Sequence, residues 1–150
     1  MTMRYRNSIP AAMLGVACGL AAFTFLYARG PSYLFDDPRT CVNCHVMRAE
    51  FDSWNRSSHK TAATCNACHT PHNLAGKYAV KALNGWNHSF AFTTGRYPDP
   101  IMIRGLNGRI AEDNCYRCHE NMVSRMLTSY SRKDVDCARC HGSVGHQERI

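Results

Sequence analysis

The sequence predicts a mainly α-helical protein with little regular structure, in which one N-terminal transmembrane helix precedes a compact domain. Three observations predict this fold class. Residues 9–28 contain no charged side chain. The rest of the chain has helical spacings of apolar residues but no convincing strand-like alternation. The pattern Cys-x-x-Cys-His, the signature of covalent haem attachment, occurs four times after the apolar segment, so the compact domain is predicted to be a tetrahaem cytochrome c domain.

The first element is the membrane anchor. Residues 9–28 form an uncharged stretch of 20 residues, which matches the ~20 residues that a helix needs to cross the hydrocarbon core. Arg4 and Arg6 precede the stretch and Tyr27 lies near its far end, as expected for flanking charges and interfacial aromatic residues. A cleaved signal peptide is the alternative, but its apolar region runs over only ~7–15 residues, and no small-x-small cleavage site follows here. An uncleaved anchor is therefore favoured.

The positions of the motifs predict the orientation of the chain. Haem of the c type is attached outside the bacterial cytoplasmic membrane, and all four motifs lie C-terminal to the anchor. We therefore expect residues 1–29 to comprise a cytoplasmic tip and a single-pass anchor in the cytoplasmic (inner) membrane. Residues 30–40, rich in Gly, Pro and Asp, are expected to form a linker. Residues 41–150 are expected to form the haem domain on the periplasmic side.

The four motifs predict four covalently bound haem c groups, numbered here 1 to 4 in chain order. Two cysteines three residues apart can bond the two vinyl groups of one haem, and the adjacent histidine can reach its iron. Structural zinc and disulfides are the alternatives, but neither needs a histidine directly after every cysteine pair. The cysteines expected to hold the haems are Cys41, Cys44, Cys65, Cys68, Cys115, Cys118, Cys137 and Cys140.

Length and charge bound the remaining possibilities. Roughly 120 residues follow the anchor, and a domain of that size with few apolar runs has difficulty in burying a large side-chain core. The haems are expected to form most of the core, and the haem-free chain is expected to be unfolded. The formal charge is +7, but the basic residues are scattered rather than clustered, and haem propionates offset much of the excess. No nucleic-acid partner is therefore expected.

Within the domain, the helical elements are predicted in order from spacing and from Gly and Pro. Apolar residues at helical spacings predict a short helix over residues 46–60. A longer helical pattern runs over residues 71–92 and is broken by the Gly- and Pro-containing residues 94–100. Residues 101–112 are ambiguous because glycines interrupt them, and a third helix is expected over residues 119–130. A polar, Gly-rich tail follows the last motif.

Histidines outside the motifs are candidate distal iron ligands. Bis-histidine ligation needs one further histidine for each haem and typically gives low-potential electron transfer. His59 and His146 lie in short polar segments near motifs and are the best candidates, whereas His72 follows its own motif too closely to reach back easily. An unligated surface histidine is the alternative for each. The expected proximal ligands of haems 2, 3 and 4 are His69, His119 and His141.

The first motif differs from the others because Met47 follows His45 by two residues. Both side chains cannot easily bond one iron from the same side, so either could be the ligand of haem 1. A thioether is a weaker donor than imidazole and tends to raise the reduction potential. Packing of Met47 against the haem edge is the other interpretation.

Four polar residues line one face of the helix predicted over residues 71–92. Lys77, Lys81, Asn84 and His88 are spaced i, i+4, i+7 and i+11. A solvated stripe is the usual meaning of such a pattern. A helix close to a membrane anchor is also where quinol would arrive, and quinol oxidation needs a base within hydrogen-bond reach of the hydroxyl. His88 could accept the proton, and Lys81 could stabilise the developing oxyanion.

Taken together, these features resemble the NapC/NirT family of membrane quinol dehydrogenases. The resemblance is carried by the anchor, the first motif extended to Cys-x-x-Cys-His-x-Met, the sequence Cys-x-x-Cys-His-x-Pro-His-Asn over Cys65–Asn73, and two later motifs. It covers nearly the whole chain. Within the family, the chain is most similar to the short form, the small subunits of ammonia-forming cytochrome c nitrite reductases.

The resemblance implies roles for residues of the electron-entry site. Met47 would be the iron ligand of haem 1, with His45 displaced, and the open face of that haem would lie by the quinol. Lys81 matches the family's quinol-site lysine. His88 lies where some members carry aspartate, which leaves open whether it binds iron, accepts a proton or caps the site.

The resemblance also implies the distal ligands and the function. His59 and His146 match distal ligands of haems 3 and 4, in an order that it leaves open, and a lysine of the catalytic partner would serve haem 2. The chain would be a membrane-anchored menaquinol dehydrogenase that passes electrons to a periplasmic pentahaem nitrite reductase within a hetero-oligomer. The alternatives are a quinol dehydrogenase of the same family that serves another periplasmic reductase, a multihaem terminal reductase, and an electron wire without a quinol site.

Overall fold

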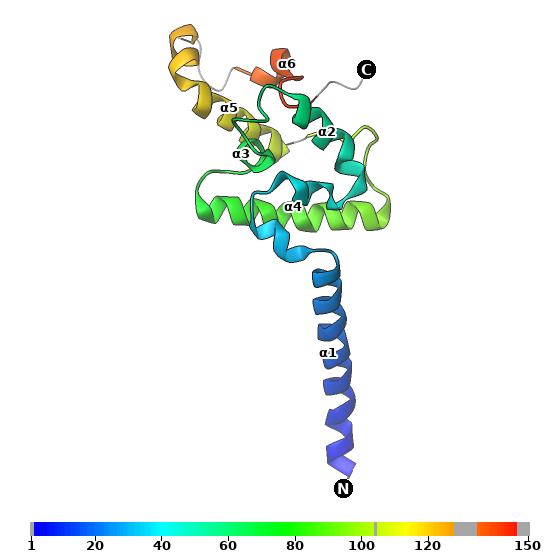
Figure 1. Ribbon diagram of the computed structural model, residues 1–150. Coiled ribbons are helices and arrows are strands. Elements are labelled where there is room, and N and C mark those ends of the chain that lie inside the picture. The colour runs from blue at the N-terminus through cyan, green and yellow to red at the C-terminus, as the bar shows by residue number, and fades with distance from the viewer. Residues whose placement is uncertain (1, 104, 128–134, 147–150) are drawn as a thin grey trace. The chain divides into compact units, whose positions relative to one another are not determined.

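The computed structural model describes residues 2–103, 105–127 and 135–146, which contain helices and turns but no strand (Figure 1). The predicted, mainly α-helical fold class is confirmed. The chain divides into two compact units, Met1–Phe35 and Asp36–Ile150, which are described separately below.

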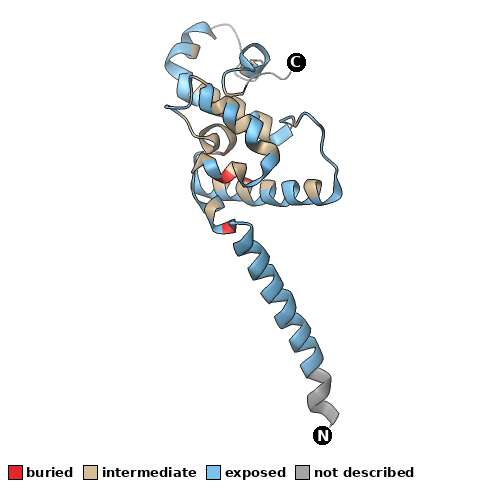
Figure 2. Cartoon of the chain, turned by 45° about the vertical axis from the view of Figure 1, so that its right-hand side comes forward, coloured by how far each residue is buried: buried red, intermediate tan, exposed pale blue. Residues whose placement is uncertain are grey.

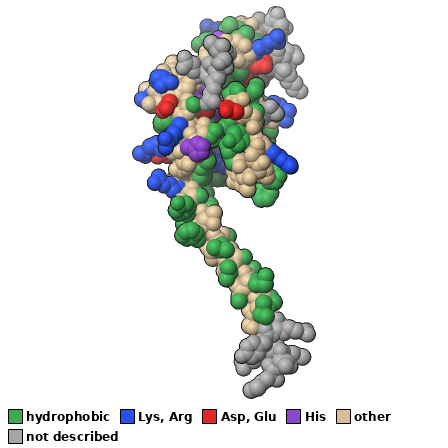
Figure 3. All heavy atoms as spheres, turned by 90° about the vertical axis from the view of Figure 1, so that its right-hand side faces the viewer, with side chains coloured by type: hydrophobic (Ala, Val, Ile, Leu, Met, Phe, Trp, Pro, Cys, Tyr) green, Lys and Arg blue, Asp and Glu red, His purple; other side chains and the backbone are tan. Residues whose placement is uncertain are grey.

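The first unit consists of a long apolar helix and a short 3-10 helix. Helix α1 spans Thr2–Tyr27, and its segment Ser8–Tyr27 has 20 residues with a mean hydropathy of 2.0 and no buried position. The segment is long and apolar enough to cross a membrane, and it agrees with the predicted anchor within one residue. The side chains of Ser8–Tyr27 are all exposed, and none of them is charged (Figures 2 and 3). The 3-10 helix η1, Gly30–Leu34, follows, so part of the predicted linker is helical.

In its described residues, the second unit begins with 3-10 helices and continues with five α-helices. The helix predicted over residues 46–60 is shorter, because a 3-10 turn occupies its start and a turn region containing Ser57 follows its end. The elements are η2 (Pro38–Asn43), η3 (His45–Met47), α2 (Arg48–Arg56), α3 (Cys65–His69), α4 (Leu74–Thr94), α5 (Gly105–Met126) and α6 (Cys137–His141).

Helix α4 confirms the long helical pattern, and its ends have local causes. The Asn73 side chain caps the first turn by accepting a hydrogen bond from the backbone N–H of Gly76 at 2.6 Å, so the helix begins at Leu74. Gly95 ends it with φ 66°, a left-handed conformation that favours glycine.

Helix α5 differs from the prediction because it starts before the third motif rather than after it. The ambiguous residues 101–112 include its first two turns, which contain Gly105 and Gly108. Gly105, the first residue, has a φ of 52° that favours glycine, whereas Gly108 lies inside the helix, where a glycine costs about 1 kcal/mol relative to alanine. Here the cost is offset by tertiary contacts, since Ile110 and Asn114 on the same helix are buried. The helix ends at Met126, and the predicted end near residue 130 lies outside the described residues.

Side chains of the second unit bury one another only sparsely. Among the described residues, Val80 and Ile110 are the buried hydrophobic side chains, and Thr40, Thr70 and Asn114 are the buried polar ones (Figure 2). Helix α5 packs against α3 and α6, and α2 packs against η2 and η3. The motif-bearing helices α3 and α6 are therefore assembled around α5, and the elements of the first motif, η2 and η3, pack against α2.

Candidate functional site

The backbones of the second, third and fourth cysteine motifs suit attachment to one haem each. Helices α3 and α6 coincide with the second and fourth motifs, and the third motif lies inside α5. Residues three and four apart share one face of a helix, so both cysteines and the histidine of such a motif project to the same side. The first motif spans η2 and η3 instead.

The first and second motifs are neighbours in space. The thiols of Cys41 and Cys65 are hydrogen-bonded to each other, which lowers the pKa of Cys41 to about 7 and raises that of Cys65. The nearby positive charge of Lys81 also lowers the pKa of Cys41. Helix α4 therefore brings an ammonium group to the first motif.

The second, third and fourth motifs are also neighbours in space. Burial raises the pKa of Cys68, and the neighbouring Cys118 thiol adds to the effect. Burial likewise raises the pKa of Cys115 to about 11, with further contributions from Glu112 and from the Cys137 thiol. The second motif thus lies beside the third, and the third beside the fourth, so the motifs follow one another in space in chain order.

Two pairs of histidine rings have the separation required of opposite ligands on one iron. The ring centroids of His59 and His119 are 6.1 Å apart, and those of His69 and His146 are 6.0 Å apart. Two metal–nitrogen bonds of about 2 Å each, plus the distance from each nitrogen to its ring centre, give about 6 Å. The donor set therefore fits two bis-histidine haems.

His146 is oriented by the backbone and side chain of Glu50. Its Nδ1 lies 3.1 Å from the Glu50 carbonyl oxygen and 3.4 Å from the Glu50 carboxylate Oε2. A proton on Nδ1 that is donated to these oxygens leaves Nε2 to bind iron, as in ligating histidines generally. Opposite it, burial lowers the pKa of His69 to about 4, which keeps that imidazole neutral and able to ligate.

The two histidine pairs can be compared with the distal ligands that the resemblance implies for each haem. His59 faces His119 of the third motif, which agrees with one of the two implied orders, that in which His59 serves haem 3. His146 lies opposite His69 of the second motif, the position that the resemblance leaves to a partner lysine. His141 is exposed on α6.

His72 has polar partners in place of an iron-ligand geometry. Its Nε2 is 2.6 Å from an Arg117 guanidinium nitrogen and 3.2 Å from the Ala67 carbonyl oxygen. This agrees with the expectation that His72 is awkwardly placed as a ligand. At the first motif, Met47 is half-buried whereas His45 is exposed, which is the relation expected if the thioether faces a haem.

Asp36 links the first turns of α4 to the second motif. Its carboxylate accepts hydrogen bonds from Lys77, from Lys81 at 3.3 Å and from the Asn66 amide at 2.7 Å. The hydrogen bond from Lys77 is the main reason why the pKa of Asp36 is lowered. The Lys77 and Lys81 side chains are only 19% and 14% exposed, so both cations are held inside the unit.

The polar face of α4 predicted from spacing is therefore turned toward the rest of the unit. Lys77 and Lys81 contact Asp36, and the Asn84 amide oxygen accepts a hydrogen bond from Asn107 at 3.0 Å. Partial burial lowers the pKa of His88, which keeps its imidazole neutral at pH 7. The arrangement brings Lys81 to the first motif.

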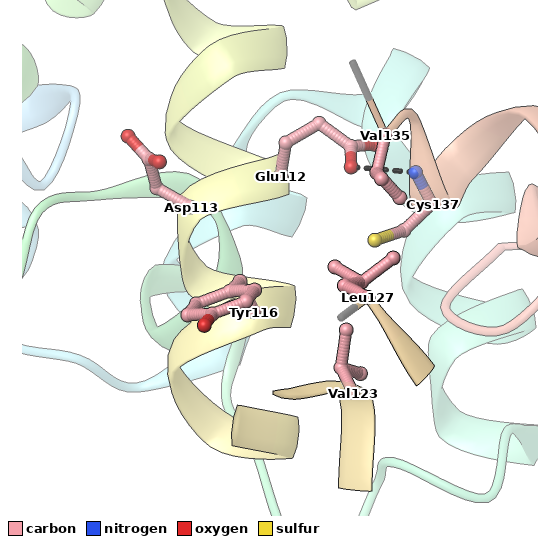
Figure 4. Close-up of a pocket in the computed structure, with 7 residues that line it drawn as sticks. All are labelled: Glu112, Asp113, Tyr116, Val123, Leu127, Val135 and Cys137. Carbon is pink, nitrogen blue, oxygen red and sulfur yellow. Dashed lines mark hydrogen bonds between the residues drawn. The ribbon is translucent and has the colours of Figure 1, made fainter. Parts of the chain in front are cut away.

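Further residues that sequence reasoning missed hold the motifs together. The Glu112 carboxylate accepts a hydrogen bond from the backbone N–H of Cys137 at 2.7 Å (Figure 4). It accepts a second from the backbone N–H of Ala138 at 2.8 Å, and so holds α6 against α5. The Asn114 amide donates to the carbonyl oxygens of Cys68 and Thr70 at 2.9 and 3.0 Å. These partners lie 25 or more residues apart, so no local sequence signal could have identified them.

Three comparisons relate the chain to known proteins. Residues 4–149 match the model of the NapC/NirT cytochrome c family, N-terminal region. The chain is 37% identical to the cytochrome c-type protein NrfH of Wolinella succinogenes, over 89% of this chain and 82% of that protein. It is 30% identical to the cytochrome c nitrite reductase subunit NrfH of Nitratidesulfovibrio vulgaris, over 95% of this chain and 84% of that protein.

A solved structure has the same architecture. One chain in the crystal structure of the cytochrome c nitrite reductase NrfHA complex bound to the HQNO inhibitor superimposes with a TM-score of 0.62. The two chains are 29% identical, and the match covers 93% of this chain and 90% of the other.

Proposed function

The chain belongs to the NapC/NirT cytochrome c family, and from this premise we propose that it is a membrane-anchored tetrahaem menaquinol dehydrogenase. It would pass electrons to a periplasmic pentahaem nitrite reductase, with which it forms a hetero-oligomer. The names of the two NrfH relatives and of the NrfHA complex support this partner. The anchor would keep residues 41–150 at the periplasmic face of the cytoplasmic membrane.

The eight motif cysteines would hold four haem c groups, which supply one-electron iron centres. Met47 would ligate the first iron, and the motif histidines His69, His119 and His141 the other three. The ring separations of 6.0 and 6.1 Å support His146 as the second ligand beside His69 and His59 as the second ligand beside His119. Glu50 would keep the Nε2 atom of His146 directed at the metal.

The observation that carries the quinol proposal is the position of Lys81. Its ammonium group is largely buried, is held by Asp36 and lies close enough to the first motif to lower the pKa of the free Cys41 thiol. A fixed positive charge at this place would stabilise the negative charge that develops on a quinol oxygen as its proton leaves. His88 is neutral at pH 7 because partial burial lowers its pKa, so it would accept that proton.

Reduction of the haem-loaded chain by a menaquinol analogue tests the proposal. The complete chain is reconstituted in lipid nanodiscs and mixed with a dimethylnaphthoquinol, and haem reduction is followed by absorbance in a stopped-flow instrument. We expect reduction of the unaltered chain, and about a hundredfold slower reduction for Lys81→Ala because one preorganised charge is lost.

Arg109→Ala is the matched control, since it removes an exposed cation from α5. This variant should be reduced at the unaltered rate. Equal rates for Lys81→Ala and the unaltered chain would rule out the assigned role of Lys81, and no reduction of any form would rule out quinol oxidation. Affinity purification of the chain from its native membrane should also recover a pentahaem nitrite reductase.

A further inference from the structure

Helix α4 carries a continuous apolar face that is exposed. The large side chains of this outer face are Tyr78, Leu83, Trp86 and Phe90, which are 43%, 45%, 71% and 50% exposed. Exposed alanines at positions 75, 79 and 82 fill the spaces between them at helical spacing. No acidic residue occurs anywhere in α4. A face with this many large apolar side chains is unusual for a surface that meets only water.

The opposite face of α4 holds the helix to its own unit. Val80 is buried, Lys77 and Lys81 bind Asp36, and Asn84 binds Asn107. These residues lie about half a turn around the helix from Trp86. The motif-bearing helices α3, α5 and α6 all lie on one side of α4, and in both ribbon views the other side of the helix is left uncovered within this unit (Figures 1 and 2).

The length of the chain keeps α4 close to the membrane that α1 is suited to cross. Asp36, which binds α4 directly, is the ninth residue after Tyr27, the last residue of the apolar helix. Nine residues span at most about 30 Å when fully extended. The 3-10 helix η1 shortens this reach, because a 3-10 helix rises only about 2 Å per residue. Whatever the orientation of the two units, Asp36, which binds α4, therefore lies within about 30 Å of the end of the apolar helix.

The composition of the outer face suits lipid headgroups better than a protein surface. Trp and Tyr prefer the membrane–water interface because their rings are apolar while the indole N–H and phenol O–H remain hydrated. Interfacial helices combine such residues with Phe and Leu, and their apolar face is immersed by about 5–10 Å. The lack of acidic residues also avoids repulsion from anionic lipids.

We propose that the outer face of α4 lies in the headgroup region of the membrane, with the helix parallel to the membrane surface. The chain would thus contact lipid at two places, through the α1 anchor and through this face. The proposal depends on the anchor and on the geometry of α4, not on quinol oxidation. If the chain did not oxidise quinol, the proposed lipid contact of α4 would still stand. If α4 did not contact lipid, the proposed quinol oxidation would still stand.

Photo-crosslinking from lipid tests the contact. The complete haem-loaded chain is placed in nanodiscs of phosphatidylethanolamine and phosphatidylglycerol that contain a trace of phosphatidylcholine with a diazirine on an acyl chain. After irradiation and proteolysis, mass spectrometry locates the lipid adducts. We expect adducts on α1 and on residues 83–90 of α4. Met122 and Met126 on α5, which are 62% and 71% exposed, serve as the matched apolar control and should carry several-fold fewer adducts.

A charged variant and the intact complex complete the test. Leu83→Asp combined with Trp86→Asp should lower the adducts on α4 while those on α1 and the haem absorbance spectrum stay unchanged. Adducts on α4 no more frequent than on α5, with α1 still labelled, would overturn the proposal. It would also be overturned if the nitrite reductase partner abolished the α4 adducts and protein–protein crosslinks formed at positions 83–90 instead.

Discussion

At the scale of single residues, the functional assignments depend on side chains that orient others. Asp36 holds two lysines of α4 and the Asn66 amide of the second motif, while Glu50 orients His146. Neither carboxylate belongs to a motif, and their partners are 30 to 96 residues away. Such residues cannot be identified from local spacing, because the information lies in how distant segments pack.

Asp36→Asn should destabilise the protein in a pH-dependent manner. The pKa of Asp36 is lowered from its ordinary value of 3.8, so the folded state favours the carboxylate, and its stabilising effect is present above pH 3.8. The effect is lost as the pH falls through the lower pKa of the folded state. Because the side chain is 44% exposed, we expect a loss of about 1 kcal/mol at pH 7.

Guanidinium unfolding of both haem-loaded proteins at pH 7 and at pH 3 measures this difference, which should shrink at the lower pH. Asp52→Asn, an exposed carboxylate on α2, is the control and should have no effect at either pH. A difference for Asp36→Asn that is equally large at both pH values would contradict the assigned ion pairs.

Removal of a proposed distal histidine should change the spin state of one iron. Loss of a sixth ligand converts a low-spin bis-histidine iron into a high-spin or water-ligated one. His146→Ala and His59→Ala should each remove one low-spin signal from the EPR spectrum, whereas His72→Ala, whose ring binds Arg117, should remove none. An unchanged spectrum for His146→Ala would assign the site opposite His69 to another ligand.

At the scale of elements, α4 and the C-terminal part of α5 could be predicted from the sequence, and the start of α5 could not. Asn73 and Gly95 give α4 local start and stop signals, and its polar face is visible from spacing alone. The start of α5 contains two glycines, so its helical state depends on burial of Ile110 and on the hydrogen bonds of Asn114. Local propensity gives the wrong result there because tertiary contacts outweigh it.

Asn114→Asp should separate α5 from the second motif. Aspartate has the same shape but cannot donate to the carbonyl oxygens of Cys68 and Thr70, and its charge would face them in a buried site. We expect a loss of about 3 kcal/mol in the free energy of unfolding, measured by guanidinium titration of the haem-loaded chain. The same change at the exposed Asn121 of α5 should alter the stability by less than about 0.5 kcal/mol. Equal effects at both positions would contradict the role of Asn114.

At the scale of the whole molecule, the anchor, the four motifs and the family could be predicted from the sequence. The motifs were recognisable because cysteine and histidine at fixed local spacing carry the chemistry themselves. The spatial order of the motifs and the pairing of His146 with His69 required the structure.

The haem-free chain should not fold into a stable second unit. Val80 and Ile110 are the only hydrophobic side chains buried among the described residues, and two such side chains contribute about 3–6 kcal/mol at most. This is far below the conformational entropy cost of ordering a domain. A chain produced without haem attachment should therefore show no cooperative thermal transition by circular dichroism, whereas the haem-loaded chain should show one. A cooperative melt of the haem-free chain would contradict this expectation.

The sparse burial of side chains has a consequence for how this protein can evolve. Side chains of the second unit bury one another so little that most substitutions remove little packing between side chains. We therefore expect purifying selection to act mainly on the motif cysteines, the iron ligands, the side chains that would contact haem, and a few bridging amides and carboxylates. At the remaining positions we expect the amino-acid sequence to vary more freely. The two NrfH proteins, which are 37% and 30% identical to this chain over the aligned residues, have the sequence divergence that this expectation allows.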